Sequence, residues 1–311
     1  MTTRKHAESR EFSAWWVPVV EEASFGFKPG REMMQSANVG PMQTEEVTFS
    51  FGQNWQRFVT EHLNPQREQI AASSLCDFLE LPDLRCRSFM DIGCGSGLFS
   101  LAAHRLEASK VISFDVDPFS VRCCEELKRR VDKSANWQVL HGSVLDRAFL
   151  ESLGEADVVY AWGSLHHTGD MWQAIRNAAN RVDRDGLFYL SIYNKVEGRK
   201  GSLFWRDIKR LYNRSPKPGK RLLEMAHVLR RGILPRIASL ENPAKFFSSY
   251  HRARGMSYWT DVRDWLGGYP YEFASAHEVF LFCSRELGLS LRNLRVTNTL
   301  GTNEFLFQRR D

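Results

Sequence analysis

The stretch SFMDIGCGSG, residues 88–97, decides the fold, because in it a short apolar run meets a glycine-rich turn. The run predicts a strand over 87–92, and the apolar residues after the turn predict a helix over 98–106. Glycine is needed where the backbone turns sharply or approaches a ligand closely. A strand, a glycine turn and a helix in this order are typical of the ligand-binding start of an open α/β sheet.

Strand-like and helix-like segments keep alternating after this unit, which is typical of βαβ connections. The turn signal Asp185-Gly186 introduces the fifth strand. We therefore expect an α/β fold: a Rossmann-like, doubly wound, seven-stranded sheet that ends in an antiparallel strand pair. The expected strands cover 87–92, 110–116, 137–141, 156–162, 187–193, 291–297 and 304–309, and the expected helices between them cover 98–106, 119–131, 172–182 and 275–287.

Two regions leave this pattern. The first 87 residues are expected to form a helical cap that buries Trp55, Phe58, Ile70, Leu75 and Phe78. The region after the fifth strand contains proline and glycine breaks between short amphipathic stretches, which predicts a helical insertion. We expect four segments: an N-terminal cap (1–87), a ligand-binding core (88–193), a basic helical insertion acting as a lid or as a substrate or oligomer contact (194–270), and the completion of the core (271–311).

The bulk composition is that of a folded globular chain, with 311 residues of which 43% are hydrophobic and 25% charged. No apolar run approaches the ~20 residues that a membrane helix needs, and the charged N-terminus has no signal-peptide core behind it. We therefore expect a cytoplasmic protein. The six cysteines include no CxxC pair, so neither a metal site nor a disulfide framework is indicated.

The net charge of +5 is unevenly distributed, because the stretch from Lys195 to Arg254 holds 16 Lys+Arg against 4 Asp+Glu. Charge alone does not choose among three interpretations. The block could be a solvated surface or an oligomer contact; it could bind an anionic small molecule or an anionic membrane face; or it could bind RNA. Nucleic acid is the least favoured partner, because no basic-aromatic RNA signature accompanies the block.

The acidic residues around the turn bear on which ligand it holds. Its glycines follow the spacing GxGxG rather than the GxGxxG of dinucleotide sites, and Asp91 precedes them. Asp91 would repel a pyrophosphate, whereas it would attract a cationic sulfonium cofactor with a free amino group. Asp115 ends the second expected strand about 20 residues after the loop, where a carboxylate can bind both ribose hydroxyls. The alternative for Asp115 is a helix cap or a turn aspartate before Pro118.

Four ordered segments carry a resemblance to a known family: DIGCGSG (91–97), ISFDVDP (112–118), HGSVLD (141–146) and DVVYAWGSLHHTGD (157–170). In these segments the sequence resembles the class I S-adenosylmethionine-dependent methyltransferases, especially the small-molecule branch that includes the quinone-biosynthesis methylases. The resemblance covers residues 88–193 well and the closing helix and strands loosely. It implies S-adenosylmethionine as cofactor, S-adenosylhomocysteine as product, no metal, and direct in-line transfer of the methyl group to an oxygen, nitrogen or sulfur atom of a small-molecule acceptor.

The resemblance also implies roles for single residues. Many relatives carry an aspartate where this chain has Ser143, whose hydroxyl accepts a hydrogen bond from the adenine amino group more weakly. The glycines would pack against the methionine part of the cofactor, while Asp91 would face its amino group and Asp115 would hold the ribose. The expected cofactor-binding set is Asp91, Gly93, Gly95, Gly97, Asp115, Val116, Ser143, Val144 and Trp162.

Candidates for the acceptor side follow the fourth and fifth strands, at the edge where ligands bind in open α/β sheets. One of His166 and His167 could remove a proton from the acceptor. We expect it to be His166, which lies closer to the strand end, with pocket shaping by both histidines as an even alternative. Tyr193 is the third catalytic candidate, and the expected substrate contacts are Asn194, Tyr269 and Tyr271.

Two other functions stay open. An RNA methyltransferase that uses the basic insertion would show salt-dependent RNA binding. A non-catalytic cofactor-binding protein of the same fold would bind the cofactor without turnover on any acceptor.

Overall fold

A computed structural model describes residues 63–131, 134–254 and 258–310. In this part of the chain, seven strands form one sheet in the order β3-β2-β1-β4-β5-β7-β6. The first five strands are parallel to one another, whereas β7 is antiparallel to both β5 and β6. The predicted sheet with its closing antiparallel pair is therefore confirmed. The strands are β1 Ser88–Ile92, β2 Lys110–Asp115, β3 Trp137–His141, β4 Ala156–Trp162, β5 Val182–Tyr193, β6 Leu289–Arg295 and β7 Thr302–Arg309.

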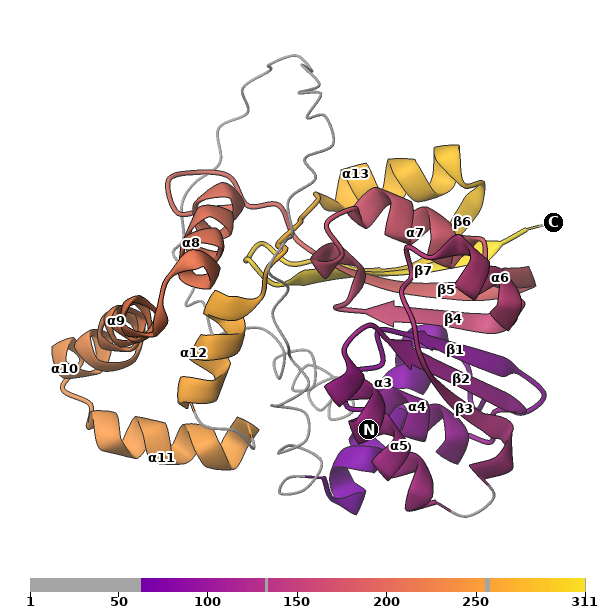
Figure 1. Cartoon of the computed structure of the whole chain (residues 1–311), viewed down its shortest axis with the longest axis horizontal. Coiled ribbons are helices and arrows are strands. Elements are labelled where there is room, and N and C mark those ends of the chain that lie inside the picture. Colours follow the sequence, from indigo (N-terminus) through magenta and orange to yellow (C-terminus); the bar gives the residue numbers. More distant parts are fainter. Residues whose placement is uncertain (1–62, 132–133, 255–257, 311) are drawn as a thin grey trace, which may run out of the picture.

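Helices cover both faces of this sheet (Figure 1). Successive strand residues alternate between the two faces. Phe89 accordingly belongs to a buried cluster with α3, α4 and α5, and Met90 to a second cluster with α6, α7 and α13. These helices are α3 Pro65–Leu79, α4 Leu98–Arg105, α5 Pro118–Arg129, α6 Arg147–Leu153, α7 Met171–Ala179 and α13 Ala276–Leu281, with 3₁₀ turns η1 Ser134–Asn136 and η2 Leu165–His167 and a π-helical turn η4 Phe282–Glu286.

Local sequence specifies where several of these helices begin. Asp117, Asp146 and Asp170 cap α5, α6 and α7, each accepting a hydrogen bond from a backbone N–H of the first turn. Ser275 and Glu278 cap α13 reciprocally. Each of these caps ends a loop that leads into its helix. The caps therefore hold the ends of the loops at the carboxyl edge of the sheet.

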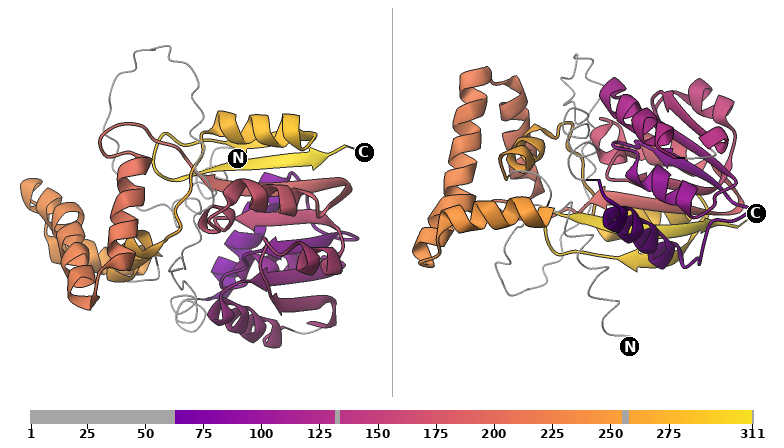
Figure 2. Two further views of the ribbon diagram at one scale, coloured as in Figure 1. Left: turned by 45° about the horizontal axis from the view of Figure 1, so that its top comes forward. Right: turned by 90° about the horizontal axis from the view of Figure 1, so that it is seen from below.

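A second group of helices comes between β5 and α13 in the sequence. In space it extends beyond the carboxyl ends of the parallel strands, away from the sheet (Figures 1 and 2). It has its own buried cluster, built around Trp205, Tyr212, Val228 and Trp265. The expected helices of this region are therefore present, while the division of the chain into four segments stays a prediction. The elements are α8 Ser202–Arg214, α9 Lys217–His227, η3 Val228–Ile233 (a π-helical turn), α10 Leu234–Ala238, α11 Pro243–Arg254 and α12 Tyr258–Gly267.

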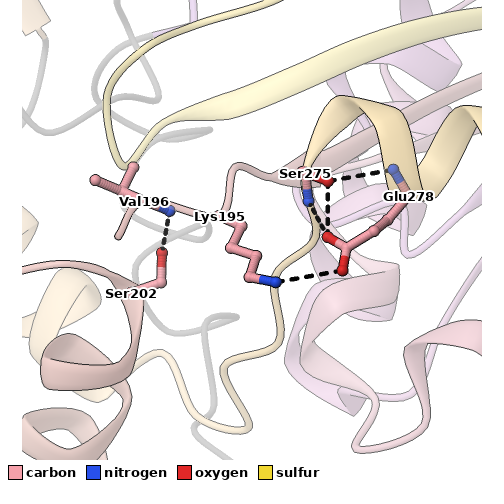
Figure 3. A network of polar contacts seen from close by, with 5 residues as sticks. All are labelled: Lys195, Val196, Ser202, Ser275 and Glu278. Carbon is pink, nitrogen blue, oxygen red and sulfur yellow. Dashed lines mark hydrogen bonds and ion pairs between the residues drawn. The ribbon is translucent and has the colours of Figure 1, made fainter. Parts of the chain in front are cut away.

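A polar network fixes the start of this second group to the core (Figure 3). The ammonium of Lys195 pairs with Glu278 Oε1 at 3.3 Å, and Glu278 also closes the cap of α13. One residue further on, the backbone N–H of Val196 donates to Ser202 Oγ at 2.9 Å. The exit from β5 is thus held both to α13 and to the first turn of α8.

Several element boundaries differ from those expected. β5 begins at Val182 rather than Leu187, because Val182 already pairs with Ala156 and the Asp185-Gly186 signal forms an irregularity inside the strand, where Asp185 has φ 59°. Leu75 and Phe78 are buried as expected and Ile70 packs against the same cluster, whereas Trp55 and Phe58 lie outside the described residues. Among the described residues, no helix is long and apolar enough to span a bilayer.

Candidate functional site

The glycine turn lies where the strand order reverses, between β1 and its two neighbours β2 and β4. Gly93, Gly95 and Gly97 have φ values of 74°, 52° and 82°, which side chains disfavour. A Cβ at Gly93 would lie 2.4 Å from Ser164 Cβ, and the Ser164 hydroxyl donates to the Ile92 carbonyl at 2.7 Å. The turn is therefore packed directly against the loop that follows β4, and position 93 admits only glycine without rearrangement.

Asp115 closes the other side of the turn. Its carboxylate accepts a hydrogen bond from the backbone N–H of Gly95 at 3.0 Å and another from that of Asp117 at 2.8 Å. The cap of α5 is Asp117, so Asp115 is not that helix cap. Burial raises the pKa of Asp115 to about 6, because the charged form is poorly solvated there.

Asp91 lies at the end of a buried polar chain beneath the turn. The indole N–H of Trp137 donates to Ser113 Oγ at 2.8 Å, Ser113 donates to Ser100 Oγ at 2.7 Å, and Ser100 donates to the Asp91 carboxylate. Burial raises the pKa of Asp91 to about 7, and the nearby charge of Asp115 acts in the same direction. Sequence reasoning missed this chain, because its serines lie on separate elements and no local pattern relates them.

The buried carboxyl group of Asp91 and the half-buried one of Asp115 thus meet at one glycine turn, and the pKa of each is raised. Each would be stabilised in its charged form by a cation placed beside it. A ligand with a positive sulfur atom, an amino group and a ribose fits this pair better than a pyrophosphate does. The two carboxyl groups at the turn therefore agree with S-adenosylmethionine, the cofactor expected from the sequence.

The remaining expected cofactor residues lie at the same sheet edge but differ in exposure. Val116 is 62% exposed, and its carbonyl accepts a hydrogen bond from the ring of His141 at 2.9 Å. Ser143 Oγ accepts from the N–H of Leu145 at 3.2 Å. Val144 is buried, and Trp162 packs partly buried against the core. An exposed valine next to the turn leaves an apolar surface that a flat purine ring could cover.

His166 is fully buried in the 3₁₀ turn after β4. Its Nδ1 accepts a hydrogen bond from the backbone N–H of Tyr193 at 3.3 Å, so the proton of the neutral ring is assigned to Nε2. Nε2 has no hydrogen-bond partner among the described residues. Burial lowers the pKa of His166 well below its usual value, so the ring is neutral at pH 7. Its one basic lone pair therefore already faces the backbone of β5.

His167 has the opposite arrangement. Its Nδ1 lies 2.6 Å from the carbonyl oxygen of Pro270, which can only accept, so Nδ1 carries the proton and the lone pair is on Nε2. Burial lowers the pKa of His167 to about 4. This tautomer is the one that a general base acting through Nε2 requires. The two rings thus differ in tautomer, and the assignment of the general base to His166 stays a prediction.

Tyr193 and Tyr271 form an aromatic wall beside the histidines. The ring centroid of Tyr193 lies 4.0 Å from that of His166 and 5.0 Å from that of Tyr271. Burial raises the pKa values of both tyrosines, so neither phenol ionises near neutral pH. Their contribution at pH 7 is therefore shape and neutral polar contact.

A buried lysine completes this cluster from the helical region. Lys209 is 1% exposed, donates to the carbonyl of Trp265, and holds its Nζ 3.9 Å from the Trp265 ring centroid and 4.8 Å from that of Tyr271. Burial lowers its pKa well below the usual value. Sequence reasoning missed Lys209 within a basic run. The available signal was its spacing with Trp205 and Tyr212, which places the three on one face of α8.

Two expected substrate contacts are engaged in the protein itself. Asn194 donates its amide hydrogens to the carbonyls of Thr297 and Thr299, at 2.8 and 3.1 Å, and accepts from Asn303 at 3.0 Å. These bonds give Asn194 a structural role in joining β5 to the loop before β7. The hydroxyl of Tyr269 accepts from Arg210 Nε at 3.2 Å. Contact of either residue with substrate stays a prediction.

Comparison with known proteins fits this geometry. Residues 90–188 match the sequence model of a family described as "Methyltransferase domain". Residues 90–188 are thus similar to a methyltransferase domain, and this similarity agrees with S-adenosylmethionine as the expected cofactor. The placement of the glycine turn at the start of the matched region agrees with that assignment.

Similar individual proteins were found by sequence and by structure. The ribosomal protein L11 methyltransferase of Alkaliphilus metalliredigens is 32% identical over 122 residues, which are 38% of this chain and 36% of that protein. The protein of the same name from Aliivibrio fischeri is 46% identical over 50 residues, 16% of this chain and 17% of that one. The chain thus spans about a third or less of the length of these relatives.

Two solved structures are similar in shape. An O-methyltransferase family protein from Burkholderia thailandensis is 14% identical, with a TM-score of 0.48 and coverage of 86% of this chain and 65% of that one. Magnesium protoporphyrin IX methyltransferase from Synechocystis PCC 6803 is also 14% identical, with a TM-score of 0.48 and coverage of 84% and 95%.

Proposed function

We propose that this chain transfers the methyl group of S-adenosylmethionine to an oxygen, nitrogen or sulfur atom of a small molecule. The observation that carries the proposal is the contact between Asp115 and Gly95, which sets a carboxylate against the glycine turn of a methyltransferase domain. When bound, the cofactor supplies a methyl group on a positively charged sulfur. The residues of the chain then hold, orient and shield it.

The cofactor site is assembled from the ends of four strands, β1 to β4. Asp115 binds the ribose hydroxyls, and Asp91, below the turn, attracts the amino group of the methionine part. Gly93, Gly95 and Gly97 allow the backbone to approach that part closely. The adenine lies along the next strand ends, against Val116, Ser143, Val144 and Trp162.

The acceptor side is formed by the loop after β4 and the end of β5. His167 takes the acceptor proton through Nε2, while its Nδ1–H is held by the Pro270 carbonyl. His166 positions the backbone of Tyr193. An acceptor that is already ionised needs no base, and for it the site acts through proximity and alignment alone.

A cofactor-consumption assay tests the proposal. The full chain is incubated with S-adenosylmethionine and a panel of phenols, amines, thiols and carboxylates, and S-adenosylhomocysteine is measured. Turnover on at least one class, lost in Asp115→Ala, supports the proposal. Cofactor binding without turnover on any acceptor, including protein and RNA, favours the non-catalytic alternative.

A protein acceptor is the second candidate, because both of the sequence relatives named above are ribosomal protein L11 methyltransferases. Methylation of ribosomal protein in the same assay, with no activity on the small-molecule panel, would favour it. RNA is the third candidate and rests on the basic charge between Lys195 and Arg254. The cytoplasm, where all three acceptor classes occur, stays the proposed location.

A further inference from the structure

The helical region beyond β5 exposes more large apolar side chains than the rest of the described chain. Of the 15 large hydrophobic residues that are exposed in the described part, 10 lie between Leu203 and Trp259. Single exposed apolar residues are ordinary, whereas a contiguous set indicates a contact surface. Whether these residues form a contact surface therefore depends on whether they lie together on one face of the helices.

Five of the ten lie along one helical run, and a sixth, Leu240, lies in the turn directly after it. The elements α9, η3 and α10 follow one another without a break from residue 217 to residue 238. Leu222, Met225 and Leu229 are 67%, 59% and 49% exposed, and their spacing of three and four residues places them on one face. After the π-helical turn the run continues with Leu234 and Ile237, which are 51% and 57% exposed, and Leu240, 96% exposed, lies in the turn that follows the run.

The opposite face of this run is the one that packs on the protein. Glu224 and Val228 are buried, and Gly232 lies so close to Phe247 and Tyr258 that an added Cβ would come within 3.2 Å of Phe247. The helical run therefore packs against the rest of the helical region through one face, and its exposed apolar stripe lies on the opposite, outward face. Its exposure is not required by the packing of the helical region.

The charge that accompanies the stripe is almost entirely positive. Residues 217–240 contain six basic residues and one acidic residue. The acidic residue, Glu224, is buried and bonded to Tyr212 and Arg263, so it does not offset the surface charge. The basic residues are Lys217, Lys220, Arg221, Arg230, Arg231 and Arg236, of which Arg231 and Arg236 are half-buried and the guanidinium of Arg236 lies over the Phe246 ring.

We propose that the outward face of residues 217–240 binds an anionic lipid bilayer, with the helical run lying in the plane of the interface. A helix with an exposed apolar stripe and a cationic polar surface inserts the stripe at the boundary of headgroups and acyl chains, while its cations meet the lipid phosphates. The positive charge beside the stripe favours an anionic bilayer over a purely apolar protein surface as the binding partner. The proposal does not depend on which acceptor the enzyme methylates.

Vesicle sedimentation with the full-length chain tests this. Vesicles of phosphatidylcholine with phosphatidylglycerol should bind the protein, and vesicles of phosphatidylcholine alone should bind it at least tenfold more weakly. Binding should weaken with added salt, because the electrostatic part is screened. The variant L222Q/M225Q/L229Q should lose at least tenfold in partitioning to the anionic vesicles. Its circular dichroism should be unchanged, since all three side chains are exposed.

Matched control variants show whether binding depends on this surface in particular. The variant L294Q/V296Q changes two exposed apolar residues elsewhere, 43% and 57% exposed, and should bind as the parent does. The variant R221E/R230E should also lose binding. No binding of the parent to anionic vesicles would overturn the proposal, as would equal binding by the stripe variant. If the protein forms a dimer without lipid and L222Q/M225Q/L229Q dissociates it, the stripe is a self-association surface. If the protein binds RNA, and this binding depends on Arg221 and Arg230 but not on the stripe, the cations are a nucleic-acid site.

Discussion

The carboxylate of Asp115, at the end of β2, accepts a hydrogen bond of 3.0 Å from the backbone N–H of Gly95 in the turn after β1. This bond joins the two adjacent parallel strands at the edge where the sheet order reverses. It also orients a half-buried carboxyl group whose pKa is raised to about 6. The turn and the acid are therefore one unit, and a ligand that binds the turn meets Asp115.

Replacing Asp115 should mainly affect the cofactor. Asp115→Ala removes the proposed hydrogen bonds to the ribose, so we expect the binding free energy for S-adenosylhomocysteine to weaken by ~2 to 4 kcal/mol. Isothermal titration calorimetry measures this directly. Asp83→Asn, on an exposed loop and near the opposite edge of the sheet, serves as the control and should bind normally. Unchanged affinity in Asp115→Ala would remove Asp115 from the site.

The pH dependence of cofactor binding should follow Asp91 and Asp115. Their pKa values, about 7 and about 6, lie above the ordinary value of 3.8, so both carboxyls take up protons as pH falls below 7. A cationic ligand requires the ionised forms. Affinity should therefore level off near pH 8 and fall by up to about tenfold per pH unit between pH 7 and pH 6, where about one proton is released on binding.

Calorimetry in buffers of different ionisation enthalpy measures that proton release. Asp91→Asn should bind more weakly at pH 8 and lose the part of the pH dependence nearest pH 7. The raised pKa values also affect the unfolding free energy, because the folded protein holds these protons more tightly than the unfolded chain does. Their contribution to stability is fully present below pH 3.8 and is lost as the pH rises to about 7. Constant affinity between pH 6 and pH 8 would contradict this account.

Gly93 and Ser164 should show coupled effects. Gly93→Ala places a Cβ 2.4 Å from Ser164 Cβ on a backbone with φ 74°, so we expect a loss of ~1 to 3 kcal/mol of unfolding free energy and weaker cofactor binding. Ser164→Gly removes the clash but not the backbone strain. The double variant should therefore recover part of the lost stability in urea denaturation. Strictly additive effects would show that the two loops are not in contact.

The sequence predicted the sheet well because its signals are local. Apolar runs, turn glycines and capping aspartates lie within a few residues of the elements that they specify, as Asp117 does for α5. The site was predicted less completely because it depends on contacts between distant residues. Neither the orientation of the His166 ring towards the Tyr193 backbone nor the engagement of Asn194 by Asn303 leaves a local pattern. Lys209 shows the same limit, because a lysine in a basic run is ordinarily solvated.

The two histidines should separate in kinetics. His167→Ala should lower turnover by ~100-fold on acceptors of high pKa and leave cofactor affinity nearly intact, as expected for a general base. On a thiolate acceptor the loss should be small. His166→Ala should instead lower the unfolding free energy by ~1 to 3 kcal/mol, because the ring is fully buried and bonded to β5. A larger kinetic loss in His166→Ala than in His167→Ala would restore the preference drawn from the sequence.

Lys209 should make the protein more stable as the pH rises. Burial lowers its folded-state pKa well below 10.5, so the unfolded chain binds more protons in the window between the two values, and unfolding becomes harder as pH approaches 10.5. Lys209→Met keeps the length of the side chain and removes the titrating group. Urea denaturation between pH 7 and pH 10 should show a rise in unfolding free energy for the parent and a flatter curve for the variant. Lys217→Met, an exposed lysine of the next helix, should follow the parent within ~0.5 kcal/mol. If Lys209→Met and the parent give parallel curves, Lys209 is charged and solvated in the folded protein, and its amine is not enclosed by Trp265 and Tyr271.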